Sequence, residues 1–506
     1  MSLSVSRRSV LAGAAALPFL RVPGARAAAP GTLTFGLSSY PPNILPWANT
    51  GTAAATVKLM IYRGLTGFAP DGSLRGELAE SWKAEGANAW VFKLRDAVFQ
   101  NGEKFTSADV KWTIEQVVDA KSTAYLKGQM QGIEKIETPD DKTVRFVMKA
   151  ADATLPTAFA NFHLPIIARN SDPKTPVGAG PFMIKAQERG VSIELEPFAK
   201  YYKPGLPKLK AIRAVAYADE NLRVAALQAG DVDLIEYVPW QSMEAISKDG
   251  KLTLDAVDGP YMYLVFNASK PPFNDPRVRK AIAHAIKRDE IVKAAFFGRG
   301  SALAHLPIPK ASAFFNPELE NGWNYDPARA KKLLAEAGHP DGFSCSLLST
   351  AQYGMHKDTA EVVQQNVAAV GIKAELNLPD WATRVTLGNK GQYEMAVMGD
   401  AADSNDPDGI AKAVDGSLTA SYSRSFGLKT EKLTALLKAG RAEFDDAKRK
   451  AIYKEMEALA IEEAPMVGLA WRSQGYAMQK RVSGFKNLPG ALSFYSGTTF
   501  EDVSVG

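Results

Sequence analysis

The sequence predicts a multidomain protein of the α/β class. Its 506 residues exceed the length of roughly 250–300 residues at which one hydrophobic core stops growing, so two or more domains are expected. Between residues 344 and 398, strand-like and helix-like segments alternate in the order β-α-β-α-β. This alternation predicts parallel strands that are joined by right-handed helical crossovers.

Apolar runs and turn residues predict the elements before this unit. Strands rich in β-branched and aromatic residues are expected at 32–37, 90–94, 143–147, 191–195 and 261–266. Thr106, with Asp109 three residues later, begins a predicted helix that ends at Val118. Two more helices are predicted, a short one at 222–229 that ends at Gly230 and one long helix at 276–297.

The best-marked helix comes just before the alternating unit. Asp326 is its N-cap, Pro327 takes the first helical position, and Gly338 ends it. The unit itself is predicted to have strands at 344–349, 372–377 and 393–398 and helices at 357–370 and 381–387. In open sheets of this kind, ligands bind outside the carboxyl ends of the strands. We therefore expect ligand contacts from the loops at 350–356, 378–381 and 399–408.

Residues 1–27 are predicted to be a twin-arginine export signal. A basic segment around Arg7 and Arg8 precedes the apolar run 10–20, and Ala25-Arg26-Ala27 has the small-x-small pattern of a signal-peptidase site. The run is shorter than the ~20 residues needed to span a bilayer. The single cysteine, Cys345, is far from the cleavage site and excludes a lipid anchor there. The pattern predicts a periplasmic protein that starts at Ala28; an uncleaved N-terminal anchor is the alternative.

The mature chain is predicted to be nearly neutral. The whole chain has 60 basic and 55 acidic side chains and a net charge of +5. Removing the four arginines of the signal leaves 56 basic side chains and a net charge of about +1. No basic field remains that would indicate a nucleic-acid partner, and no further segment resembles a membrane span. One cysteine also excludes an internal disulfide.

Motifs of catalysis and of metal binding are missing from the sequence. It has no His-Glu-x-x-His, no Gly-x-Ser-x-Gly, no phosphate-binding loop and no complete Gly-x-Gly-x-x-Gly. The histidines stand apart, without metal-ligand spacing, at His163, His284, His305, His339 and His356. We therefore predict a protein that is not an enzyme and has no cofactor or metal. A periplasmic hydrolase or metalloenzyme, with a site assembled from distant residues, is the alternative.

Collinear segments over most of the chain carry a resemblance to a known family. They include Leu78-Ala79-Glu80-Ser81-Trp82, Pro176-Val177-Gly178-Ala179-Gly180-Pro181-Phe182, Ala226-Leu227-Gln228-Ala229-Gly230-Asp231, Pro272-Phe273-Asn274-Asp275, Arg277-Val278-Arg279-Lys280-Ala281 and Tyr325-Asp326-Pro327. In these segments the sequence resembles the family 5 extracellular solute-binding proteins. This family comprises the peptide, dipeptide and nickel-type receptors of ABC importers.

The resemblance implies a two-lobed periplasmic-binding-protein (Venus-flytrap) fold of class II, cluster C type, with an additional third domain. Lobe I is then expected at 28–50, 175–262 and 478–506, the third domain at 51–174, and lobe II at 263–477. Two chain crossings between the lobes imply a hinge that closes on a ligand. The implied protein is a monomer that captures a peptide or a related amino-bearing solute and delivers it to an inner-membrane permease. Nickel chelates, opines and oligosaccharides stay open as ligands.

The resemblance also implies an anchor for a ligand ammonium. Peptide-binding members use a carboxylate four residues before the proline of an Asp-Pro or Glu-Pro dipeptide. Here Asp406-Pro407 puts this position at Asp403, in the third of the expected loops. The tryptophan of those members is replaced by Asp400, which changes the shape and charge of the pocket. For Asp403, an Asx-turn and a calcium ligand are the alternatives, although the loop lacks the Gly and terminal Glu of an EF-hand.

Further contacts are predicted around this anchor. Dipeptide-type members hold the ligand carboxylate with an arginine early in the helix predicted at 357–370, where this chain has Lys357, which keeps the charge but loses the bidentate fork. Tyr353 and Trp381, on the other two loops, are expected to cover ligand side chains or to pack within the lobe. From the opposite lobe we expect Tyr40, with Ser38 and Asn43 as equal alternatives.

Overall fold

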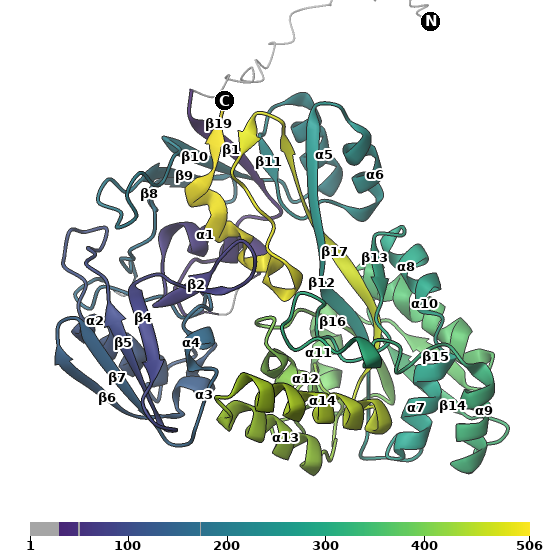
Figure 1. The fold of residues 1–506 in the computed structure, drawn as a ribbon. Helices are drawn as coiled ribbons and strands as arrows, with labels where there is room; N and C mark the ends of the chain where they lie inside the picture. Colours follow the sequence, from purple (N-terminus) through teal and green to yellow (C-terminus); the bar gives the residue numbers. More distant parts are fainter. Residues whose placement is uncertain (1–29, 49–50, 173) are drawn as a thin grey trace, which may run out of the picture.

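The chain folds into two lobes and a third domain (Figure 1). The structure is a computed structural model that describes residues 30–48, 51–172 and 174–506. The predicted export signal and its cleavage site after Ala27 lie outside these residues. Within the described ranges, every helix is too short or too polar to cross a membrane.

Lobe I, at the top of Figure 1, is built on a mixed sheet. The first predicted strand is confirmed as β1 (Thr32–Leu37), which pairs in parallel with β10 (Ala211–Ala216) and β11 (Leu234–Ile235). The antiparallel strands β9 (Ser192–Pro197) and β8 (Phe182–Glu188) extend this sheet. Its helices are α1 (Thr52–Ile61), α5 (Glu220–Ala229), which ends at Gly230 as predicted, and α6 (Trp240–Lys248).

Two long strands carry the sheet from lobe I into lobe II (Figure 1). β12 (Leu252–Phe266) and β17 (Val467–Gln479) pair antiparallel, and β17 also pairs with β11 while β12 pairs with β16 (Met395–Asp400). Between the pairs Asp258–Ser473 and Tyr261–Trp471, β12 holds Gly259 and Pro260 where β17 holds only Arg472. This β-bulge bends the strands at the junction of the lobes. The short β13 (Gly300–Ala302) pairs with β17 at the same place.

Lobe II contains the predicted β-α-β-α-β unit. β14 (Ser344–Leu348) pairs in parallel with both β15 (Lys373–Asn377) and β16, and the crossover helices are α10 (Gly354–Ala368) and α11 (Trp381–Asn389). The capping of α9 (Pro327–Glu336) is confirmed too, because the Asp326 carboxylate accepts from the Arg329 N–H at 2.9 Å. The lobe is completed by η1 (Pro317–Leu319), η2 (Pro407–Ile410), α12 (Ala411–Val414), α13 (Glu431–Ala442) and α14 (Asp446–Glu463).

The single helix predicted at 276–297 is wrong. The segment forms two helices, α7 (Pro276–Ala285) and α8 (Arg288–Phe296), with Ile286 in an extended conformation between them. The Lys287 N–H donates to the Asn366 side chain at 2.7 Å instead of to a carbonyl one turn back. The Arg288 guanidinium takes the freed carbonyl of Ala283. The side chains of Asn366, from α10, and of Arg288, at the start of α8, therefore replace the helical bonds at the break.

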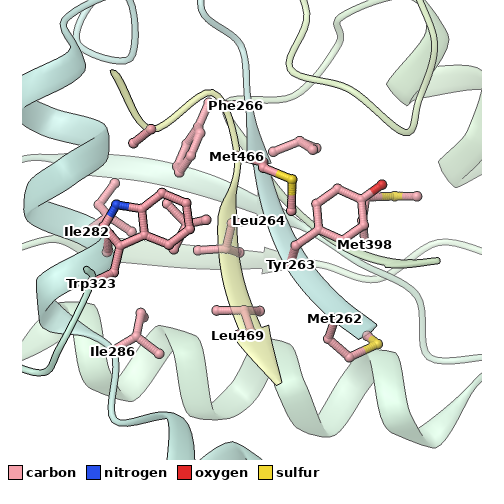
Figure 2. Close-up of a cluster of buried hydrophobic side chains, with 14 of the residues drawn as sticks. Met262, Tyr263, Leu264, Phe266, Ile282, Ile286, Trp323, Met398, Met466 and Leu469 are labelled. Carbon is pink, nitrogen blue, oxygen red and sulfur yellow. The ribbon is translucent and has the colours of Figure 1, made fainter. Parts of the chain in front are cut away.

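The core of lobe II lies on both faces of the crossing strands. Figure 2 shows Trp323 and Ile282 on one side of the strand pair and Tyr263 and Met398 on the other. Strands that are buried on both faces have nearly continuous apolar sequences. The Trp323 indole N–H is satisfied by the carbonyl of Ile461 at 3.0 Å.

The third domain, on the left of Figure 1, is an antiparallel sheet covered by a helix. Its strands follow the order β4 (Ala79–Ala84), β5 (Ala89–Leu94), β7 (Thr143–Met148) and β6 (Ile133–Asp140). The helix predicted from Thr106 is confirmed as α2 (Ser107–Val118), with a capping box between Thr106 and Asp109. Smaller elements are β2 (Thr66–Phe68), β3 (Leu74–Gly76), α3 (Lys127–Met130) and α4 (Leu155–Ala158).

The hydrophobic cores bear on the expected domain limits. The core of the third domain is formed between Leu65 and Ala179. α1, which the expected limits give to the third domain, packs instead with the strands of lobe I. The C-terminal segment, η3 (Gly490–Asp502) with β18 (Val482–Ser483) and β19 (Ser504–Val505), returns to lobe I. The limits stay a prediction, and shared packing would move the first of them to about residue 62.

Candidate functional site

Two neighbouring cavities lie where the lobes and the third domain meet. The acidic cavity has a volume of about 750 Å³ and is lined by Tyr125 and His163 of the third domain and by Asp400, Asp403, Lys412 and Arg472 of lobe II. The aromatic cavity has a volume of about 710 Å³ and is lined by Ser38, Ser39 and Tyr237 of lobe I and by Tyr353, Met355, His356 and Trp381 of lobe II. Thr52 and Gly399 line both cavities, which are therefore adjacent.

The acidic cavity is named for two carboxylates that share one ammonium. Asp400 ends β16, Asp403 follows in the next loop, and Lys412 is on α12. The Lys412 ammonium lies 3.1 Å from Asp400 Oδ1 and 3.6 Å from Asp403 Oδ1, and it donates to the Ala401 carbonyl at 2.9 Å. Burial by itself lowers the pKa of Lys412, but the two carboxylates raise it well above its usual value. Lys412 is therefore charged, and it is the protein's own counter-ion for Asp400 and Asp403.

Asp403 presents its carboxylate to the cavity. Its side chain is 41% exposed, and the Tyr125 O–H donates to Oδ1 at 3.0 Å. Burial raises the pKa of Tyr125, and Asp403 raises it further, so the phenol is a neutral donor. Of the alternatives for Asp403, the Asx-turn of this loop belongs to Asp406, which accepts from the Asp408 N–H at 2.9 Å. Among the described residues, no group of His, Cys, Asp or Glu is arranged to hold a metal ion.

The other two acidic residues of the loop are held by arginines. Asp406 binds the Arg449 guanidinium at 2.5 Å, and Asp408 binds Arg441 at 2.6 Å. Burial raises the pKa of Asp408 to about 6. These pairs fix the loop that carries Asp403 against α13 and α14.

Tyr353 and Trp381 come together in the aromatic cavity, as their two loops predict. Their rings meet edge to face with centroids 5.6 Å apart, and the His356 ring lies 5.4 Å from Trp381. Arg384 is stacked between Trp381 and Tyr422, 5.2 Å and 5.7 Å from the ring centroids. Burial, with the nearby Arg384 and Arg472, lowers the pKa of His356 to about 3, so that this ring is neutral.

The structure does not bring Lys357 or Tyr40 to either cavity. Lys357 is half exposed and pairs with Glu361 at 3.6 Å, while Asp358 of the same helix lines the aromatic cavity. The Tyr40 hydroxyl donates to Gln187 at 3.3 Å, and its ring packs against the core of lobe I. From the loop of Tyr40, the expected alternative Ser38 does reach the aromatic cavity.

Several cavity residues have no signal in the sequence. Tyr125, His163 and Arg472 lie far from the predicted loops along the chain and reach the cavities only through the packing of the three parts. For Lys412, the sequence offers only indirect evidence, from the residue at position 400. An aspartate at position 400, where peptide-binding members have a tryptophan, adds a charge that needs a cation close by.

Comparison with known proteins identifies the family. Residues 73–421 match the family described as "Bacterial extracellular solute-binding proteins, family 5 Middle". The chain belongs to this family. It is 28% identical over 487 residues to the glutathione-binding protein GsiB of Pectobacterium atrosepticum, with 91% of each chain covered. It is also 28% identical over 483 residues to GsiB of Escherichia coli K12, with 91% of this chain and 92% of the relative covered.

Solved structures share the fold over nearly the whole chain. The PBP AgaA from A. tumefaciens R10, solved in complex with agropinic acid, is 38% identical with a TM-score of 0.83, covering 94% of this chain and 99% of AgaA. MoaA from the same strain, solved with mannopinic acid, is 27% identical with a TM-score of 0.75, covering 94% and 100%. The chain is therefore a solute-binding protein of the kind that works with ABC importers, with the implied two-lobed fold and third domain.

Proposed function

We propose that this protein is a periplasmic receptor that captures a small solute with an amino group and a carboxylate, a peptide or an opine, and delivers it to an ABC permease. The observation that carries the proposal is the pair of adjacent cavities between the lobes, with the half-exposed Asp403 carboxylate in one of them. The crossing strands β12 and β17 supply the hinge about which the lobes close on the ligand.

The relatives support this ligand class from two directions. GsiB is described as a glutathione-binding protein, and AgaA and MoaA were solved with agropinic and mannopinic acid. The receptor binds its solute without turnover, as a monomer. The twin-arginine signal directs it to the periplasm and is cleaved after Ala27.

A thermal-shift screen of the mature protein from Ala28 tests the proposal. The panel holds di- to pentapeptides, glutathione, agropinic acid, oligosaccharides and nickel chelates, with N-acetylated peptides as matched controls. We expect stabilisation by free amines, a more compact shape by small-angle scattering when the ligand is bound, and recovery of the ligand unchanged. Recovery of an altered product would contradict a binding role, and stabilisation by sugars or chelates alone would overturn the ligand class.

Asp403→Ala tests the ammonium anchor. A charge-assisted bond to a ligand ammonium in a closed site is worth ~2–5 kcal/mol, so the variant loses most of its affinity for free amines and keeps its affinity for acetylated ones. Circular dichroism checks that the fold is intact. Asp341→Ala removes an exposed aspartate away from both cavities and serves as the matched control. Equal affinity in the Asp403 and Asp341 variants would remove Asp403 from the site.

A further inference from the structure

Arg472 is a buried cation at the point where the two cavities meet. It lies on β17 opposite the β-bulge of β12, and only 7% of its surface is exposed. It lines the acidic cavity, while its Nη1 donates to the Tyr237 hydroxyl at 2.9 Å and approaches the Met355 sulfur at 3.4 Å. Tyr237 and Met355 both line the aromatic cavity, from lobe I and lobe II respectively. The guanidinium thus touches both cavities and both lobes.

Within the part of the chain that the structure describes, Arg472 differs from the other buried arginines in having neither a carboxylate nor a backbone carbonyl as a partner. Buried guanidinium nitrogens without an acceptor also occur on Arg63, Arg288 and Arg384, but each of these arginines has such a partner. Arg63 and Arg449 bind carboxylates, Arg223, Arg279, Arg288 and Arg424 donate to three or more backbone carbonyls each, and Arg384 is stacked between two rings. Among the described residues, Arg472 reaches no carboxylate within 4.0 Å, and its buried Nε has no acceptor. A buried charge without a counter-ion is costly, so an anionic partner is expected to arrive from outside the chain.

The neighbouring charges do not supply that partner. Asp400 and Asp403 already share the Lys412 ammonium, and Asp358 at the aromatic cavity forms no ion pair with Arg472. Arg424, the remaining cation of the acidic cavity, is used by the carbonyls of Lys412, Leu418 and Thr419. Arg223, at the aromatic cavity, is likewise used by three carbonyls. Among the described cations that line these cavities, Arg472 is therefore the one with a buried N–H that has no acceptor.

We propose that Arg472 is the anchor for a carboxylate of the ligand, which it holds at the junction of the acidic and aromatic cavities. The inference rests on the proposed function and names the residue that selects an anionic solute. A guanidinium matches a carboxylate with two parallel N–H donors, which a lysine cannot do. Because Arg472 contacts Tyr237 of lobe I and Met355 of lobe II, a carboxylate bound there lies between the closing lobes. The anchor is Arg472 rather than Lys357.

The test compares the effect on ligand affinity of removing the positive charge of Arg472 with the effect of removing that of Lys357. Wild type, Arg472→Met and Lys357→Met are titrated by calorimetry with agropinic acid, glutathione and alanyl-alanine, each beside its ester or amide. We expect Arg472→Met to lose at least about 30-fold in affinity for the acids and to bind the esters and amides as wild type does. Lys357→Met, an exposed lysine paired with Glu361, stays within about two-fold. Arg472→Lys recovers part of the loss.

Each other outcome overturns the inference. If the acids bind Arg472→Met as tightly as wild type, or if acid and amide bind wild type equally, Arg472 is no carboxylate anchor while the receptor function stands. Loss of acid affinity in Lys357→Met alone would assign the anchor to Lys357. Binding of uncharged sugars only would leave a solute receptor without a carboxylate site. If no compound binds and the shape stays open, the proposed function fails together with the anchor. Circular dichroism of each variant verifies folding.

Discussion

Two clusters of charge in this molecule are built in opposite ways. The buried ion network joins Glu77 of the third domain and Glu501 of the C-terminal segment to Arg63, Arg75 and Lys203. Both carboxylates are at most 2% exposed, and Glu501 lies 2.8 Å from Arg63, 3.0 Å from Arg75 and 2.7 Å from Lys203. In the cavities, by contrast, Asp403 is half exposed and Arg472 has no carboxylate within reach among the described residues.

This difference in pairing distinguishes charges that stabilise the fold from charges that are available to bind a ligand. In the buried ion network, the oxygens of Glu77 and Glu501 are all bound by cations of the protein itself. The network therefore joins lobe I to the third domain. Tyr201 completes it by donating to Glu501 at 2.6 Å. The charged side chains of the cavities, in contrast, can still form hydrogen bonds or ion pairs with a ligand. Paired buried charges thus mark the rigid joint, and incompletely paired charges mark the site.

Breaking the buried ion network has the largest expected effect. Glu501→Gln leaves Arg63 buried without that counter-charge, so the free energy of unfolding falls by about 3–5 kcal/mol. Urea denaturation followed by circular dichroism measures the change. Glu80→Gln alters an exposed glutamate of β4 and is the matched control. A loss as small as that of the control would show that the network contributes little to stability.

The two clusters respond to acid in different pH ranges. Burial, with nearby Lys58 and Lys412, lowers the pKa of His163 in the acidic cavity to about 3. An unfolded histidine gains a proton near pH 6.5, so this contribution to stability is complete above pH 6.5 and is lost as the pH falls toward about 3. Burial alone would raise the pKa of Glu501, but Arg63, Lys203 and Arg75 hold it well below its usual value. Its contribution is complete above about pH 4.5 and is lost only at lower pH.

In His163→Asn, the free energy of unfolding should therefore fall less steeply as the pH is lowered from neutral. Between pH 7 and pH 4 the variant loses about 2–3 kcal/mol less stability than wild type, because it has no buried ring to protonate on unfolding. Urea denaturation at a series of pH values provides the measurement. His339→Asn, outside both cavities, is the control. Parallel pH curves for wild type and the His163 variant would show that His163 titrates normally.

The same substitution in the two clusters sharpens the contrast. Without ligand, Arg472→Met changes the free energy of unfolding by less than about 1 kcal/mol, because removal of an uncompensated buried cation offsets the lost contacts with Tyr237. Arg63→Met, in the buried ion network, costs about 3–5 kcal/mol, because Glu77 and Glu501 each lose a partner. Equal losses in the two variants would mean that Arg472 is structural.

Local patterns predicted much of the fold and pointed to loops that line one side of the two cavities. The alternation between residues 344 and 398 predicted parallel strands, which β14, β15 and β16 form, and the carboxyl end of β16 pointed to the loop of Asp403. The helix starts after Thr106 and Asp326 were predicted because caps are local. These features depend on residues that lie within a few positions of one another.

The rest depends on contacts between distant segments. The break after α7 depends in part on Asn366, which lies far along the chain and accepts from the Lys287 N–H, while Arg288 donates to the Ala283 carbonyl. The apolar pattern of residues 276–297 does not predict the contact with Asn366. Arg472 lies in a mostly apolar strand. Whether any carboxylate of the described residues reaches it depends on the distant segments that pack around this strand, which local sequence does not reveal. Lys357 matched the family position by counting, but helix α10 turns it toward Glu361. Sequence position pointed to loops whose residues line the two cavities and could not tell which charges were already paired.

The smallest expected effect on ligand affinity concerns the contact between the third domain and lobe II. Tyr125→Phe removes the O–H that binds Asp403 at 3.0 Å, a bond that forms only when the two parts are together. Its loss weakens closure by about 0.5–1.5 kcal/mol, which is roughly 2- to 12-fold in ligand affinity, while the Trp90–Phe444 ring contact still joins the same parts. Calorimetry beside Tyr325→Phe, an exposed tyrosine of lobe II, measures it. Tighter binding would instead mean that a ligand ammonium displaces the Tyr125 hydroxyl from Asp403, because Asp403 would then be freed in advance.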